Sequence, residues 1–214
     1  MINAQKVIEK EYPIERADWD GWLRDTPYCL YQTFRVPQLT NIDEYKKVDI
    51  FYSQLGQDLW VARYLKGKSK GFYIDIGCYD PVHENNTYYF ERNLGWEGLS
   101  ITPHDWLKKE WQGVRDVTSL IVDTGIPLPK DKSIDYLSIS NTESSLEIIE
   151  AVKDLEIKCI TIRHDGYNDS GELMQKQREI LSESYTLELA GNTNGDGHND
   201  FWVNETTQSK QLND

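Results

Sequence analysis

The segment Phe72-Tyr73-Ile74-Asp75-Ile76-Gly77-Cys78-Tyr79-Asp80-Pro81 decides the fold. Its apolar start and the glycine after it are typical of a short buried strand that ends in a tight turn. Gly77 has no Cβ, so the backbone can approach a ligand closely, and the Asp75 carboxylate can accept hydrogen bonds from a ligand or from turn amides. Ligands of doubly wound sheets bind outside the carboxyl ends of the strands. The segment therefore predicts a ligand site at this strand end, with an ordinary glycine turn as the alternative.

Strand and helix patterns alternate along the rest of the chain. The expected strands are 71–77, 98–102, 115–122, 134–140, 157–162, 185–191 and 199–205, and the expected helices are 53–66, 84–94, 104–111, 144–155 and 171–183. This alternation implies βαβ crossovers and a mainly parallel sheet in an α/β fold, with the last two strands as a β-hairpin. We expect residues 1–48 to form a helical N-terminal extension and residues 49–214 to form one domain.

The composition excludes several classes of partner. The 214 residues carry a formal net charge of -13, which would repel a nucleic acid or an anionic membrane surface. No apolar run approaches the roughly 18 residues of a membrane-spanning helix. The three widely spaced cysteines, Cys29, Cys78 and Cys159, are typical of reduced thiols. We therefore expect a cytoplasmic protein that binds no nucleic acid and no membrane.

Further motifs flank the opening segment. They are S-Q-L-G-Q-D at 53–58, N-N-T-Y at 85–88, G-W-E-G at 95–98, I-D-Y-L-S-I-S at 134–140 and I-T-I-R-H-D at 160–165. In this order and spacing the motifs resemble those of the FkbM-type methyltransferases, and the resemblance covers most of the chain. It implies a Rossmann-like class I methyltransferase fold, a mainly parallel seven-stranded sheet with a C-terminal β-hairpin. It also implies S-adenosylmethionine (SAM) as cofactor and S-adenosylhomocysteine (SAH) as product.

The resemblance further implies which residues hold SAM. Asp75, Gly77 and Asp80 would border its methionine part, and residues 86–87 would lie on the following helix. Gln54 and Asp58 would lie beneath or beside the same pocket, with helix capping as the alternative for both. The full expected set is Gln54, Asp58, Asp75, Gly77, Cys78, Tyr79, Asp80, Asn86, Thr87, Thr102, Pro103, His104 and Ser140.

The sequence departs from the family pattern at three strand ends. Where the family has a Glu for the ribose of SAM, the second strand ends in Thr102-Pro103, and a Thr hydroxyl cannot form the charge-assisted pair of a carboxylate. His104 or Asp105 could substitute. Ser140 replaces an Asp and Arg163 replaces a Glu, and such losses argue against a metal, because hard cations need clustered carboxylates. They also leave open a degenerate module that binds a glycan or a protein partner without turnover.

Methyl transfer to a hydroxyl needs a base, and histidine is the natural base near neutral pH. His164 follows the fifth strand with Asp165 beside it, and His83 is the second candidate. The abundant aromatic residues either stack on a sugar or simply fill the core. We therefore expect an O-methyltransferase for a hydroxyl of a sugar, a glycan or another small molecule. Residues 192–197 imitate a calcium loop but lack its closing Glu, so we expect a hairpin loop and no metal.

Overall fold

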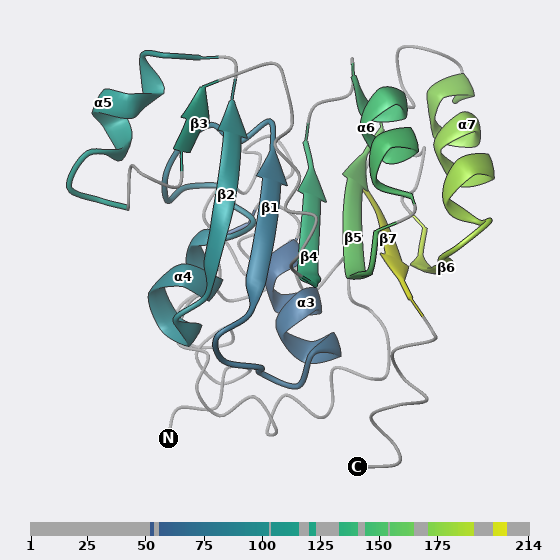
Figure 1. Ribbon diagram of the computed structural model, residues 1–214, viewed down its shortest axis with the longest axis horizontal. Helices are drawn as coiled ribbons and strands as arrows, with labels where there is room; N and C mark the ends of the chain where they lie inside the picture. The colour runs from purple at the N-terminus through teal and green to yellow at the C-terminus, as the bar shows by residue number, and fades with distance from the viewer. Residues whose placement is uncertain are drawn as a thin grey trace, which may run out of the picture.

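A seven-stranded sheet forms the centre of the molecule, with the strands in the order β3-β2-β1-β4-β5-β7-β6 (Figure 1). The computed structural model describes residues 52–53, 56–102, 104–115, 120–122, 133–140, 144–153, 155–164, 171–190 and 199–204. The strands are β1 (Phe72–Ile76), β2 (Glu97–Thr102), β3 (Leu120–Val122), β4 (Ile134–Ile139), β5 (Ile157–Arg163), β6 (Thr186–Leu189) and β7 (Asn199–Val203). Strand β7 is antiparallel to β5 and β6, and the other described pairs are parallel.

One described helix precedes the first strand, and four others lie in connections between strands. They are α3 (Gln57–Tyr64), α4 (Tyr88–Leu94), α5 (Leu107–Trp111), α6 (Ser145–Val152) and α7 (Glu172–Leu181). The chain runs outward from β1 through β2 to β3 and then returns to β4 on the other side of β1. The crevice between the carboxyl ends of β1 and β4 is therefore the topological switch point, where open α/β sheets bind ligands.

Alternate residues of the central strands pack into two cores, one on each face of the sheet. Tyr73 of β1 and Tyr136 of β4 pack with residues of α3 and α4. Their neighbours Ile74 and Leu137 pack with residues of α6 and α7 on the opposite face. The strands are thus buried on both sides, which explains why they are nearly continuous apolar runs.

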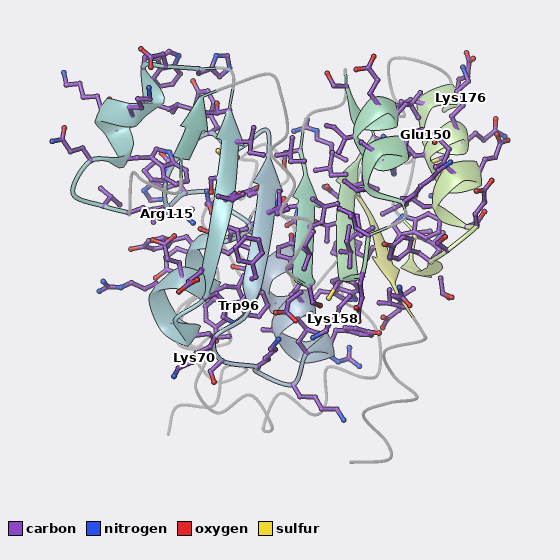
Figure 2. All side chains as sticks on the ribbon, in the orientation of Figure 1. Lys70, Trp96, Arg115, Glu150, Lys158 and Lys176 are labelled. Carbon is purple, nitrogen blue, oxygen red and sulfur yellow. The ribbon has the colours of Figure 1, made fainter. Side chains whose placement is uncertain are left out.

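The G-W-E-G motif is required for packing at the start of β2. Trp96 is 3% exposed, and its Nε1 donates a hydrogen bond to the carbonyl oxygen of Lys68 at 2.7 Å (Figure 2). A Cβ on Gly71 would lie 2.5 Å from Trp96 Cε2, and a Cβ on Gly98 would lie 2.5 Å from the Tyr73 ring. Both glycines are therefore needed to let a large aromatic ring lie against the backbone.

The predicted fold class is confirmed, and the differences lie at the ends of elements. Helices α3, α4 and α5 begin three or four residues later than expected, after N-cap positions at Gly56, Thr87 and Trp106. Strand β3 begins at Leu120, and Arg115, expected at the start of this strand, is a buried residue that follows the turn after α5. The expected N-terminal extension and the loop at 192–197 lie outside the described residues.

Candidate functional site

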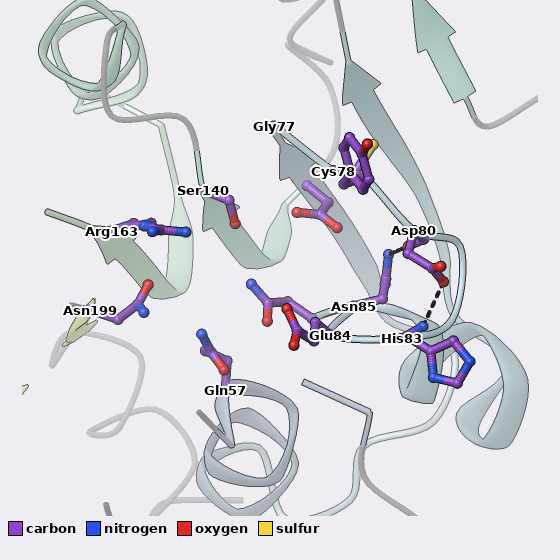
Figure 3. A pocket seen from close by; sticks show the side chains of 13 residues that line it. Gln57, Gly77, Cys78, Asp80, His83, Glu84, Asn85, Ser140, Arg163 and Asn199 are labelled. Atoms are coloured by element: carbon purple, nitrogen blue, oxygen red, sulfur yellow. Dashed lines mark hydrogen bonds between the residues drawn. The ribbon is translucent and has the colours of Figure 1, made fainter. Parts of the chain in front are cut away.

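A cavity of about 930 Å³ opens at the switch point (Figure 3). Its lining residues are Gln57, Asp75, Gly77, Cys78, Tyr79, Asp80, His83, Glu84, Asn85, Asn86, Ser140, Arg163 and Asn199. Cavities of this size commonly hold small molecules or cofactors. Six residues of the expected cofactor set from the segment 75–86 line it, and Ser140 adds a seventh from the end of β4.

Asp75 is the buried carboxylate of this cavity. It is 2% exposed at the carboxyl end of the central strand, and Thr87 Oγ1 donates a hydrogen bond to its Oδ2 at 3.1 Å. Ser138 also bonds the carboxylate and in turn accepts a hydrogen bond from Asn86 Nδ2 at 2.9 Å. Burial raises the pKa of Asp75, and the hydrogen bonds from Ser138 and Thr87 offset only part of this effect.

The loop after β1 forms one wall of the cavity. Gly77 has φ 84°, a conformation that favours glycine, and it turns the chain directly after the strand. The backbone N–H groups of Val82 and His83 donate to Asp80 Oδ1 at 2.8 and 2.7 Å. One carboxylate oxygen of Asp80 thus stabilises the turn that follows it.

Asn85 caps helix α4 from three residues before its start. Its Oδ1 accepts hydrogen bonds from the backbone N–H groups of Thr87 at 3.0 Å and Tyr88 at 2.9 Å. Asn86 and Thr87 therefore precede the helix, which corrects the expectation that they lie on it. Asn86 still lines the cavity, whereas Thr87 is fully buried and bonds Asp75 from behind.

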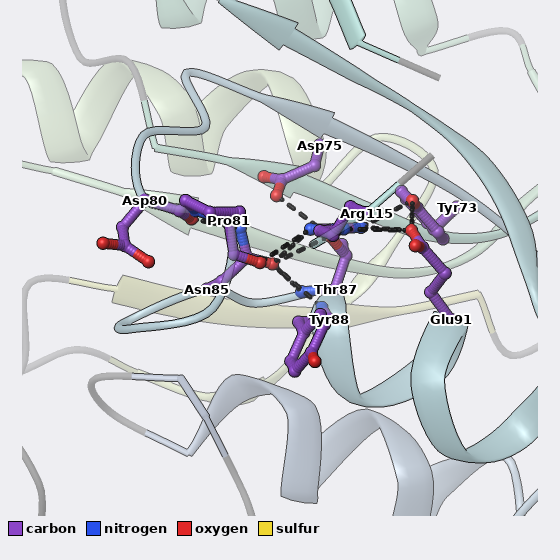
Figure 4. Close-up of polar contacts among 9 residues, drawn as sticks. All are labelled: Tyr73, Asp75, Asp80, Pro81, Asn85, Thr87, Tyr88, Glu91 and Arg115. Carbon is purple, nitrogen blue, oxygen red and sulfur yellow. Dashed lines mark hydrogen bonds and ion pairs between the residues drawn. The ribbon is translucent and has the colours of Figure 1, made fainter. Parts of the chain in front are cut away.

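Arg115 organises this wall from inside the protein (Figure 4). Its Nη2 lies 2.7 Å from both Glu91 Oε2 and the Tyr73 hydroxyl, and its Nη1 donates to Asn85 Oδ1 at 2.9 Å. Its guanidinium carbon lies 4.4 Å from the centre of the Trp111 ring. The buried guanidinium of Arg115 thus contacts β1, α4, α5 and the side chain of Asn85. Sequence reasoning missed Arg115, because the side chains that it hydrogen-bonds lie 24 to 42 positions away along the chain.

The opposite wall consists of four polar side chains from four elements. Gln57 begins α3, Ser140 follows β4, Arg163 ends β5 and Asn199 begins β7. Figure 3 shows these side chains pointing toward one space, with Asp80 and His83 on its far side. The backbone N–H of Ser140 donates to the carbonyl oxygen of Ile76 at 2.8 Å, which joins the ends of β4 and β1.

Asp58 does not line the cavity. Its carboxylate is fully buried and accepts hydrogen bonds from the backbone N–H groups of Tyr52 at 2.7 Å and Ser53 at 3.2 Å, and from the Ser53 hydroxyl. Asp58 thus anchors the segment before α3 to the first turn of the helix, and the expected cofactor contact is corrected. Gln57, one position earlier, supplies the side chain that reaches the cavity. Gln54 lies outside the described residues.

Thr102 is fully buried and does not line the cavity. Its Oγ1 accepts a hydrogen bond from the backbone N–H of His104 at 3.2 Å, so the expected ribose contact is corrected. Beside it, Tyr79, His104 and Trp106 form a cluster with ring centres 5.2 to 6.2 Å apart. Tyr79 is 59% exposed and Trp106 is 51% exposed. Pro103 lies outside the described residues.

His164 lies behind the cavity wall. It is 1% exposed, and among the described residues neither ring nitrogen has a hydrogen-bond partner. Its Nε2 lies 3.5 Å from Asp200 Oδ1, and Arg178 binds that carboxylate at 2.7 and 2.8 Å. Adjacent residues of an extended chain point in opposite directions, so the exposure of Arg163 to the cavity turns His164 away from it. This placement contradicts the expected role of His164 as a base that touches an acceptor.

His83 remains as the histidine that lines the cavity, at its exposed rim. Asp165, the expected partner of His164, lies outside the described residues. Within the described part of the chain, no group of three His, Cys, Asp or Glu side chains could hold a metal ion. No described helix is long and apolar enough to cross a membrane.

Comparison with known proteins gives similarity at the level of structure. No family model and no curated protein matches the chain. A putative rRNA-methylase from Clostridium thermocellum is 16% identical with a TM-score of 0.49, over 72% of this chain and 96% of that chain. A TehB-like SAM-dependent methyltransferase from Corynebacterium glutamicum is 12% identical with a TM-score of 0.45, over 83% and 98%. Aeropyrum pernix fibrillarin, solved with natively bound SAM, is 10% identical with a TM-score of 0.45, over 71% and 73%.

These identities and TM-scores are too low to say anything about the activity of this chain. The class of the fold follows from the topology of the chain, in which the sheet has the order β3-β2-β1-β4-β5-β7-β6 and β7 is its single antiparallel strand. The chain has a Rossmann-like fold of the class I methyltransferase type.

Replacement of Arg115 by Met should destabilise the protein by about 3–5 kcal/mol, because Glu91 and the tyrosine hydroxyl would lose a buried cationic partner. The matched control is Lys176→Met, which removes an exposed ion pair with Glu172 and should cost less than about 0.5 kcal/mol. The measurement is the free energy of unfolding in urea at 25 °C. Equal losses in the two variants would contradict the role of Arg115.

Replacement of Asp75 by Asn should stabilise the protein at neutral pH. Because burial raises the pKa of Asp75, the unfolded chain loses this proton first as pH rises, and the free energy of unfolding falls between the ordinary and the raised pKa. The variant should lack this decline in urea denaturation between acid and neutral pH.

Asp135→Asn is the control of opposite sign. Burial acts to raise the pKa of Asp135, but hydrogen bonds from Lys158 and Lys68 outweigh it, so the pKa is lowered. Its carboxylate stabilises the fold above the ordinary pKa, and that stability is lost as pH falls. Asp135→Asn should therefore lose stability at neutral pH, and a gain there would contradict the electrostatic assignment.

Proposed function

We propose that this protein is a SAM-dependent O-methyltransferase. The observation that carries the proposal is the buried Asp75 carboxylate, which faces a cavity of about 930 Å³ at the switch point of a class I methyltransferase sheet. A buried carboxylate with a raised pKa is stabilised when a cationic ligand binds beside it. The methionine part of SAM carries such a cation in its ammonium group.

The cavity residues fit the two halves of SAM to different degrees. Asp75 and the glycine turn at Gly77 suit the methionine half, since a carboxylate and close backbone approach are both available. For the adenosine half, the exposed rings of Tyr79, His104 and Trp106 offer stacking surfaces next to the cavity. Thr102 does not contribute, so the ribose would be held without the carboxylate that the family uses.

SAM would supply a methyl group that is already activated for in-line transfer. With SAM bound, the acceptor oxygen would form the new C–O bond as the C–S bond breaks, sulfur would keep that electron pair, and the hydroxyl proton would pass to a base. The protein mainly aligns the two groups, and alignment can lower a barrier by up to roughly 7–11 kcal/mol. His83 is the candidate base, because it lines the cavity and His164 does not.

The acceptor that we propose is a hydroxyl of a sugar, a glycan or another small molecule. Most of the side chains that line the cavity are polar, which suits a hydroxylated acceptor. One structural neighbour is titled an rRNA-methylase, but a net charge of -13 would repel an RNA. A cytoplasmic location, with the thiols of Cys78 and Cys159 reduced and buried, belongs to the same proposal.

The second candidate is a degenerate module that holds a glycan or a protein partner without turnover. The specific observation in its favour is the burial of Thr102, which leaves the ribose without the carboxylate of the family pattern. This candidate requires that SAM does not bind at useful concentrations.

Calorimetry with SAM and with SAH tests the cofactor directly. We expect both to bind, and Asp75→Asn to weaken both by about 10–100-fold, because one hydrogen bond to a charged group is lost. Asp135→Asn, at the opposite end of the sheet, should leave both affinities unchanged. Absence of heat from either ligand at millimolar concentration would favour the degenerate module.

A labelled-methyl assay against pools of sugars and other small hydroxyl compounds tests turnover. His83→Ala should lower the rate by about 10²–10⁴-fold with SAM affinity unchanged, because a general base is removed. His164→Ala is the comparison, since this residue is buried behind the wall. Full turnover by the His83 variant together with loss in the His164 variant would reverse the assignment.

A further inference from the structure

The charges of the cavity are separated between its two walls. Its carboxylates, Asp75, Asp80 and Glu84, all belong to β1 or to the loop that follows it. Arg163 is the only Lys or Arg among the described residues that line the cavity, and it lies across from that loop at the end of β5 (Figure 3). The acidic wall suits a cationic cofactor, which leaves the basic end for a different group.

The described neighbours of Arg163 in the cavity wall can add hydrogen-bond donors to an anion site. Asn199 and Gln57 contribute amides, Ser140 contributes a hydroxyl, and all three can donate hydrogen bonds into the same space. A guanidinium binds a carboxylate or a phosphate through two parallel hydrogen bonds, which a neutral hydroxyl cannot match. The polar groups at this end of the cavity are therefore complementary to an anionic substituent.

The backbone of Arg163 is held in place by buried contacts. Arg163 pairs with Asn199 in the register of β5 and β7, and its carbonyl oxygen accepts a hydrogen bond from Gln177 Nε2 at 3.1 Å. Gln177 is fully buried and also donates to Ser145 Oγ at 2.9 Å. Next along β7, the buried Asp200 is bound by Arg178 through both carboxylate oxygens. The base of the arginine side chain is thus fixed before any ligand arrives, which lowers the cost of ordering it.

We infer that the methyl acceptor carries a carboxylate or phosphate group, which Arg163 binds at the β5–β7 end of the cavity. This inference rests on the proposed function, since it needs the cofactor on the acidic wall. The acceptor would lie between Arg163 and the loop that carries His83, with its hydroxyl toward the switch point. Arg163 then determines which hydroxyl compounds bind, and the family's Glu at this position would repel the same substrates.

The charge of the whole protein makes this inference easy to test. A net charge of -13 repels anions at long range, so binding of a small anion cannot come from the general field of the molecule. It must come from local contacts, and a single substitution should remove it.

The anionic probes for binding at Arg163 are glucuronic acid and glucose 6-phosphate, and glucose is the uncharged control. Binding is measured by calorimetry at saturating SAH and constant ionic strength. We expect both anionic probes to bind more tightly than glucose, and Arg163→Gln to weaken them by about 10–100-fold, as expected for loss of a charge-assisted hydrogen bond. The matched control is Arg92→Gln, an exposed arginine on α4 that does not line the cavity and should change nothing.

The outcomes separate the two proposals. If SAH binds but the anionic probes bind no better than glucose, or Arg163→Gln leaves them unchanged, the anionic acceptor is refuted and the methyltransferase stands. If Arg163→Gln weakens SAH by the same factor, Arg163 holds the cofactor carboxylate and the inference fails. If wild type does not bind SAH, which is measured before any probe is added, the proposed function fails and the acceptor inference fails with it.

Discussion

A carboxylate buried at the end of a central strand costs free energy, and the surrounding structure is arranged to keep Asp75 there. Hydrogen bonds from Thr87 and Ser138 stabilise the ionised form of this carboxylate, and so does the positive charge of Arg115. Burial still dominates, because the pKa stays raised. A residue that destabilises the fold in this way and faces a cavity is a functional candidate on physical grounds, since a plain packing role would be met better by an apolar side chain.

The loop beside Asp75 has its shape because Arg115 satisfies several groups at once. Arg115 bonds the α4 carboxylate Glu91, the β1 hydroxyl of Tyr73 and the capping oxygen of Asn85. Removal of its charge would leave these groups without their shared partner in a place that water hardly reaches. The contacts of Arg115 therefore hold this cavity wall in one conformation. The packing of Trp111 against the guanidinium keeps α5 next to the wall.

The fold could be predicted from the sequence because local patterns determined it. Strand 72–76 is an apolar run with a terminal glycine, and its neighbours alternate with amphipathic helices, so the layered sheet followed from periodicity and topology rules. Residues that are close in sequence, as in the segment 75–86, were expected to lie together, and they line one cavity. The site was missed where distant chain segments meet, as with Arg115 and Asn199, because a single sequence does not report such contacts.

Two wrong expectations share one physical cause. Thr102 and His164 both end or follow a strand at the correct edge of the sheet, and both turn out to be buried. Adjacent residues of an extended chain face opposite ways, so a shift of one position decides whether a side chain reaches the cavity. Arg163 at the end of β5 reaches it, while its sequence neighbour His164 does not.

The polar side chains at the β4–β5–β7 end of the cavity form one group. Ser140, Arg163, Asn199 and Gln57 converge on one space from four elements, and Gln177 fixes the backbone beneath the arginine. Arg163 places an exposed cation on this wall, opposite the three carboxylates of the β1 side. A ligand with separated charges, cationic toward β1 and anionic toward β5, is what such a cavity would select.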